Sequence, residues 1–115
     1  MEETQIAAVH AEMYEAFDAS HCWADSSVLD ALLIGARAVG VLTDVDVFQL
    51  LDEDDRDLLL VSVELRPGVL AHAAPMRWRE LRPAPGVLGV RAVRDVLMRL
   101  AGIADQVRVA HGMPR

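Results

Sequence analysis

The side chains best suited to bind a transition metal, or to act as a nucleophile and its base, are one cysteine and four histidines: His10, His21, Cys22, His72 and His111. His21 and Cys22 are adjacent, so they cannot easily ligate one ion together, and the chain has no H-x-x-x-H or C-x-x-C spacing. Neighbours in sequence also rarely meet as nucleophile and base. We therefore expect no metal centre, and we interpret His10 as a hydrogen-bonded histidine at the edge of an apolar helix face.

The acidic run 52–57, with the sequence D-E-D-D-R-D, resembles a calcium loop only superficially. It lacks the central glycine and the distal glutamate of an EF-hand loop, and Arg56 interrupts it. A solvated helix start is the simpler interpretation. The chain also has no G-x-S-x-G turn, no glycine-rich phosphate loop and no dinucleotide-binding fingerprint. These observations predict a protein that is not an enzyme and that uses no cofactor.

Charge is distributed unequally along the chain. Residues 1–60 contain 14 acidic residues and two arginines, a net charge of −12, whereas residues 61–115 contain nine arginines and four acidic residues, a net charge of +5. The two halves should attract each other, either inside one molecule or between copies. The total of −7 makes nucleic acid an improbable partner, because phosphate binding needs a basic surface.

Every basic residue is an arginine. Arginine is favoured at protein interfaces, but the bias of a GC-rich genome would give the same composition.

Apolar residues at helical spacing predict the elements that position these charges. Helices are expected over 4–18, from Ser27 to Gly40, over 44–51, over 53–65, briefly after Pro75, and from Val87 to the C-terminal region. Alternation in 45–47 and the β-branched run in 58–65 would also fit strands, but acidic helix starts favour helices. The prediction is an all-α fold, a single compact bundle of about five to six helices spanning residues 1–115.

On the last helix, Leu97 is expected in the core, and the arginines are expected on the opposite, solvent-exposed face. The candidate interface is therefore an arginine face opposed by the acidic run, with one tryptophan between two arginines. Its residues are Asp52, Asp54, Asp55, Asp57, Trp78, Arg91, Arg94 and Arg99. Trp78 either closes the end of the core or forms an interface hot spot, since tryptophan and arginine dominate such sites.

Segments 28–33 (VLDALL), 40–46 (GVLTDVD), 56–60 (RDLLL) and 66–68 (RPG) resemble the caspase-recruitment-domain branch of the death fold. The resemblance covers about half of the chain. It implies a six-helix antiparallel bundle that assembles through oppositely charged patches. The proline-rich break at 82–86 and the long arginine helix after it have no counterpart in that family.

These features predict a non-enzymatic protein–protein interaction domain, an adaptor or assembly module that binds a protein partner or itself. The alternative is a small acidic immunity or phage-type inhibitor that blocks a basic enzyme or a nucleic-acid-binding site. A third hypothesis is a ligand- or metal-dependent domain with a pocket around His10, Tyr14 and Trp23. No apolar run approaches the length of a membrane span, and the N-terminus lacks the pattern of a signal peptide, so a soluble cytoplasmic protein is expected.

Overall fold

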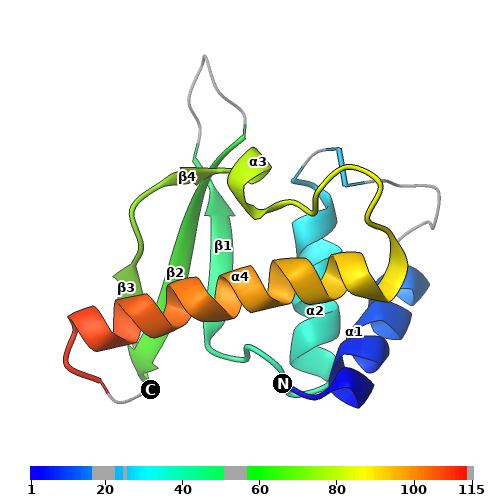
Figure 1. Cartoon of the computed structure of the whole chain (residues 1–115). Coiled ribbons are helices and arrows are strands. Elements are labelled where there is room, and N and C mark those ends of the chain that lie inside the picture. The colour runs from blue at the N-terminus through cyan, green and yellow to red at the C-terminus, as the bar shows by residue number, and fades with distance from the viewer. Residues whose placement is uncertain (17–22, 25, 51–56, 114–115) are drawn as a thin grey trace. The chain divides into compact units, whose positions relative to one another are not determined.

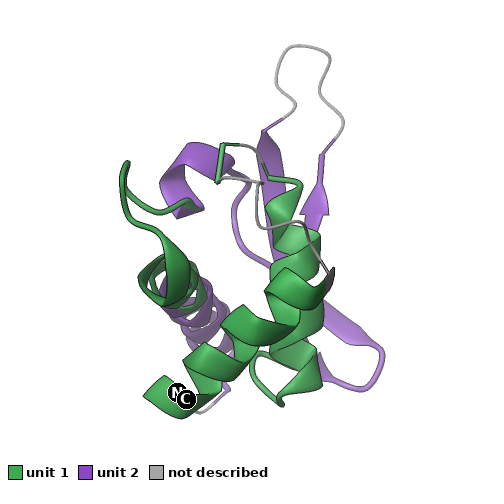
Figure 2. Ribbon diagram, turned by 90° about the vertical axis from the view of Figure 1, so that its right-hand side faces the viewer, with its two compact units in different colours: residues 1–43, 82–97 green, residues 44–81, 98–115 purple. Residues whose placement is uncertain are grey.

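The computed structural model describes residues 1–16, 23–24, 26–50 and 57–113 (Figure 1). The chain divides into two compact units, which Figure 2 shows in different colours. The first unit contains residues 1–43 and 82–97, and the second contains residues 44–81 and 98–115. Each unit has its own architecture.

The first unit is helical. It contains α1 (Glu3–Ala16), α2 (Val28–Ala38) and the first part of α4 (Gly89–Ala110). The predicted helices in these segments are confirmed, although the Ser27 side chain makes no capping hydrogen bond to α2. The apolar stripes that predicted α1 and α2 form the core here, and its largest fully buried side chains include Ile6, Val9, Met13, Val28 and Leu32.

The second unit contains an antiparallel sheet, so the prediction of an all-α bundle is wrong. Its strands are β1 (Val45–Gln49), β2 (Leu58–Arg66), β3 (Val69–His72) and β4 (Met76–Arg77). β2 is central: β1 pairs along one side of it, while β3 and β4 also pair with it. The six-helix bundle implied by the resemblance to the death fold is overturned with the all-α prediction, because β1 and β2 occupy segments expected to be helices.

The burial pattern explains why strands form in these segments. Val45 on β1 lies opposite Val63 on β2, and both side chains are buried. Leu59 and Val61 are buried on the same face of β2, at the spacing of two that a strand requires. β-branched residues pack well on such a pleated surface. The acidic residues 52–55, which favoured a helix start, lie outside the described residues.

The rest of the second unit follows the turn signals of the sequence. β2 ends at Arg66, and Gly68 has a φ of 78°, which suits the tight turn into β3. The short helix expected after Pro75 is α3 (Trp78–Leu81), which follows β4 directly. The second part of α4, residues 98–110, also belongs to this unit.

Candidate functional site

α4 carries the three arginines of the predicted interface. Its buried side chains recur at steps of one, three and four residues, which places them on one stripe of the helix. They are Ala92, Val93, Val96, Leu97, Leu100, Ala104 and Val107. The predicted core position of Leu97 is confirmed, since its side chain is fully buried.

The three predicted interface arginines of α4 differ in the contacts that they make within the chain. Arg91 is exposed and makes no hydrogen bond or ion pair with the part of the chain that the structure describes. Arg94 is 39% exposed, and its Nη1 lies 3.1 Å from Oε1 of Glu3 on α1. Arg99 donates a hydrogen bond of 2.9 Å to the carbonyl of Leu81 at the end of α3. Of the three, Arg91 is therefore the most available to a partner.

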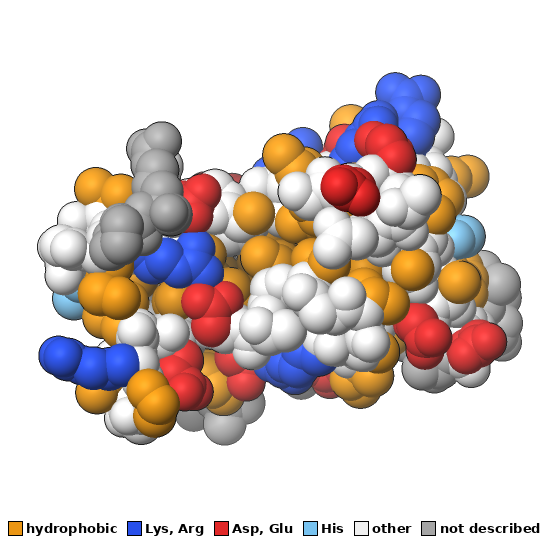
Figure 3. Space-filling model, turned by 90° about the horizontal axis from the view of Figure 1, so that it is seen from below, with side chains coloured by type: hydrophobic (Ala, Val, Ile, Leu, Met, Phe, Trp, Pro, Cys, Tyr) orange, Lys and Arg blue, Asp and Glu red, His pale blue; other side chains and the backbone are white. Residues whose placement is uncertain are grey.

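The predicted acidic counterpart falls largely outside the described residues, where Asp52, Asp54 and Asp55 lie. Asp57 is described and exposed, and its carbonyl accepts a hydrogen bond of 2.9 Å from the backbone N–H of Trp78. On the face seen in Figure 3, several acidic side chains lie directly beside basic ones.

Trp78 lies in the core of the protein. Its side chain is 1% exposed, the value of a core residue. A side chain this buried offers no surface to a partner, so of its two interpretations the structure favours the one in which it closes the core. We leave it out of the candidate surface.

Arg108 connects the acidic half of the sequence to the basic half inside one molecule. Its Nη2 lies 2.7 Å from Oδ2 of Asp44, just before β1, and its Nη1 lies 2.8 Å from Oδ1 of Asp105 on α4. The hydrogen bond to Asp44 is the main reason that the pKa of Arg108 is raised, although burial opposes the increase. Arg108 was not among the predicted interface residues. The sequence shows only that Asp105 lies three residues before it and does not reveal Asp44 as a partner.

The Arg108 network gives a first testable expectation. Asp44→Asn should lower the free energy of unfolding by about 1 kcal/mol, because a charge-assisted hydrogen bond between partly buried side chains that are distant in the sequence is lost. Asp105→Asn is the matched control and should cost less than about 0.5 kcal/mol, since it removes a pair of residues only three positions apart along one helix. Urea titrations of both variants measure the difference, and equal losses would contradict the central role of Asp44.

The pH dependence of the Arg108 network follows from the sign of the pKa shift. A cation whose pKa is raised in the folded state stabilises that state at every pH below its unfolded pKa. The stabilisation is lost only as the pH rises through the folded pKa. Arg108 therefore adds no pH dependence to the free energy of unfolding between about pH 5 and about pH 9.

The described histidines have local partners. The rings of His10 and Tyr14, one turn apart on α1, are in tilted contact, with their centroids 4.5 Å apart and their planes at 46°. Nδ1 of His111 lies 2.9 Å from the carbonyl oxygen of Val107. Among the residues that the structure describes, no three histidine, cysteine, aspartate or glutamate side chains are grouped to hold a metal ion. His21 and Cys22 lie outside those residues.

Ser62 and His72 form a pair that sequence reasoning missed. Oγ of Ser62 on β2 lies 2.6 Å from Nδ1 of His72 on β3, because the two residues are direct partners in the antiparallel register. Ser62 is 1% exposed, so its hydroxyl is not accessible to a substrate. The contact satisfies a buried hydroxyl. Only a strand assignment for 58–66 could have revealed it.

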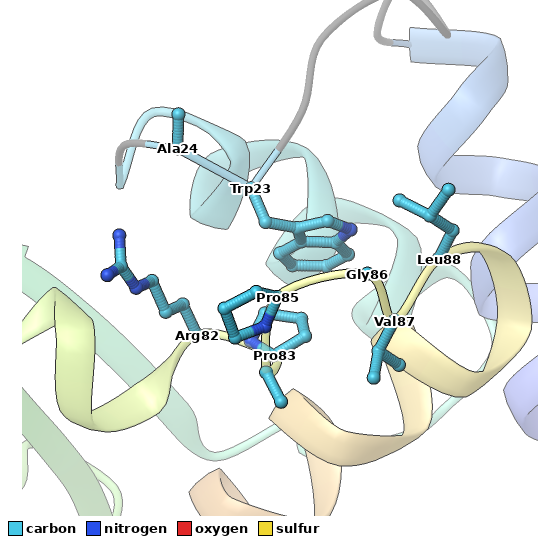
Figure 4. A pocket seen from close by; sticks show the side chains of 9 residues that line it. Trp23, Ala24, Arg82, Pro83, Pro85, Gly86, Val87 and Leu88 are labelled. Atoms are coloured by element: carbon cyan, nitrogen blue, oxygen red, sulfur yellow. The ribbon is translucent and has the colours of Figure 1, made fainter.

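A shallow apolar cavity lies in the first unit. It has a volume of about 250 Å³ and is lined by Trp23, Ala24 and residues 82–88. The indole of Trp23 lies beside Pro83 and Pro85, with Arg82 at one end of the cavity and Leu88 at the other (Figure 4). His10 and Tyr14 do not line it, so this cavity is not the pocket that was expected around His10, Tyr14 and Trp23.

None of the described helices has an apolar stretch sufficient to cross a membrane. No family model, curated protein or solved structure matches this chain. Function must therefore be argued from the residues themselves.

Proposed function

We propose that this chain is a non-enzymatic protein–protein interaction module that binds an acidic partner surface at the beginning of α4. The observation that carries the proposal is the exposure of Arg91 together with Leu88, which precedes α4 and is 70% exposed. An exposed cation within three residues of an exposed large apolar side chain offers the two kinds of group that protein interfaces favour.

Arg94 supports the same surface from the next turn of the helix. Its ion pair with Glu3 is exposed, with 39% and 70% of the two side chains accessible. Exposed pairs of this kind contribute little to folding, typically less than about 1 kcal/mol. A partner carboxylate can therefore replace Glu3 at small cost.

The experiment is capture of partners from a lysate of the source organism, with elution by increasing salt. Arg91→Glu should weaken the captured complex about tenfold and lower the salt concentration that elutes it, because complementary charge governs encounter and specificity. Arg79→Glu is the control: it makes the same charge change at an exposed arginine of α3, outside this surface. Both variants should unfold at the same urea concentration as the wild-type chain.

The same experiment distinguishes the proposed function from the alternative, an acidic inhibitor. A partner that is a basic enzyme would bind the acidic residues of the chain, and Arg91→Glu would then leave binding unchanged or strengthen it. Identical capture by the wild-type chain, Arg91→Glu and Arg79→Glu would contradict the proposed surface.

A further inference from the structure

The sheet of the second unit has one blocked edge and one open edge. Two backbone hydrogen bonds show which groups of β1 face β2. The N–H of Leu50 donates to the carbonyl of Leu58, and the N–H of Glu64 donates to the carbonyl of Asp44, both at 2.9 Å. In this alternating pattern the N–H of Val47 points away from β2. Oδ1 of Asp46 accepts a hydrogen bond from it at 2.9 Å. A side-chain carboxylate thus occupies an outward donor of β1.

β3 forms the other edge, and its outward groups have no such cover. Ala73 N–H donates to Val61 C=O at 2.9 Å, so Ala71 and Ala73 direct their backbone groups towards β2. Leu70 and His72 alternate with them and direct their N–H and C=O groups away from the sheet. Within the described residues, these outward groups of Leu70 and His72 have no hydrogen-bond partner.

The β3 edge also lacks the residues that usually prevent pairing. Natural sheets protect an open edge with charged side chains, with proline or with a covering segment. Residues 67–76, with the sequence P-G-V-L-A-H-A-A-P-M, contain no acidic residue, lysine or arginine, and both prolines lie outside β3. Val69 and Leu70 are 40% and 52% exposed. An uncharged strand with unpaired backbone groups and exposed apolar side chains favours the addition of another strand.

We propose that β3 pairs antiparallel with β3 of a second copy of this chain, about a two-fold axis at Ala71. In that register Leu70 of each copy lies opposite His72 of the other, and each such pair exchanges two backbone hydrogen bonds. Ala71 lies opposite its own equivalent, and Val69 lies opposite Ala73. No position places like charges opposite each other, so the segment is compatible with its own reverse. This self-compatibility is the reason for choosing a second copy over a strand of another protein.

Pairing through β3 is separate from the proposed binding of a partner at Arg91, and salt should affect the two in opposite directions. Two copies each carry a net charge of −7 and repel each other, so salt should strengthen β3 pairing by screening. Salt should weaken binding of an acidic partner to Arg91. Either proposal can therefore fail while the other holds.

The test is sedimentation equilibrium of the full chain from micromolar to millimolar concentration, at low and high salt. We expect a monomer–dimer equilibrium that shifts to dimer as salt is added. Leu70→Lys should raise the dimer dissociation constant about tenfold or more, because it places a charge on the pairing edge. Ile34→Lys is the control: it also places a lysine at an exposed apolar side chain, but on α2 and outside the sheet, and should leave that constant unchanged.

Amide hydrogen exchange of the wild-type chain provides a second readout that needs no variant. The amides of Leu70 and His72 should become protected as the protein concentration rises. A chain that stays monomeric at millimolar concentration, with both amides exchanging freely, would overturn the inference. This is also the result expected if β3 pairs only with a strand of another protein. Equal effects of Leu70→Lys and Ile34→Lys would also overturn it.

Discussion

Leu97→Ala should lower the free energy of unfolding by about 2–5 kcal/mol, because the substitution removes three buried carbon atoms and leaves a cavity. Leu97 is fully buried, and so are Val93 and Leu100, which lie one turn away on either side of it in α4. Close-packed neighbours on a regular helix cannot collapse fully into the space. A urea titration followed by circular dichroism measures the loss.

Met98→Ala is the matched control for this effect. Met98 follows Leu97 directly in α4, but it is 54% exposed, so its truncation should change stability by less than about 0.5 kcal/mol. Similar losses for the two variants would mean that the cost comes from the helix backbone and not from burial of Leu97. A loss below about 0.5 kcal/mol for Leu97→Ala, far under the lower limit of about 2 kcal/mol for such truncations, would contradict the packing of α4.

The sequence was sufficient to predict the elements with an uninterrupted amphipathic stripe. α1, α2 and α4 were predicted because their apolar residues recur at the helical period over three or more turns. The strands were missed because two signals conflict in 44–65. Alternating valines favoured strands, but acidic residues ahead of each apolar run favoured helix starts. The sheet register decides between them, since Val45 and Val63 meet only across two strands.

The candidate site was predictable only in its exposed part. The helical period placed Arg91 on the outer face of α4, and it is exposed there. The same pattern could not show that Arg94 pairs with Glu3 or that Arg99 binds the Leu81 carbonyl, because these partners are distant in the sequence. The β3 edge was also not visible, since a short apolar segment between two prolines becomes an edge only when β2 is known to be its neighbour.

Gly35→Ala should destabilise the chain by about 1–3 kcal/mol, because the added methyl group overpacks the contact between α1 and α2. A Cβ atom at Gly35 would lie 3.0 Å from the carbonyl oxygen of Val9 and 3.2 Å from the backbone nitrogen of Met13. Both neighbours belong to the backbone of α1, which cannot move aside as a flexible side chain would. The helices must separate, and the buried side chains of Val9 and Met13 then lose contacts.

Gly102→Ala provides the control, because the same substitution has the opposite expected sign in α4. Apart from the helix's own backbone and the two neighbouring residues, no heavy atom of the described residues lies within 4 Å of a Cβ atom at Gly102. Alanine is the better helix former and restricts the unfolded chain, so this variant should gain about 0.5–1 kcal/mol. Thermal unfolding of both variants checks the pair, with a lower midpoint expected for Gly35→Ala and a higher one for Gly102→Ala. If Gly35→Ala is also stabilising, α1 and α2 do not approach each other at Gly35 as closely as the structure places them.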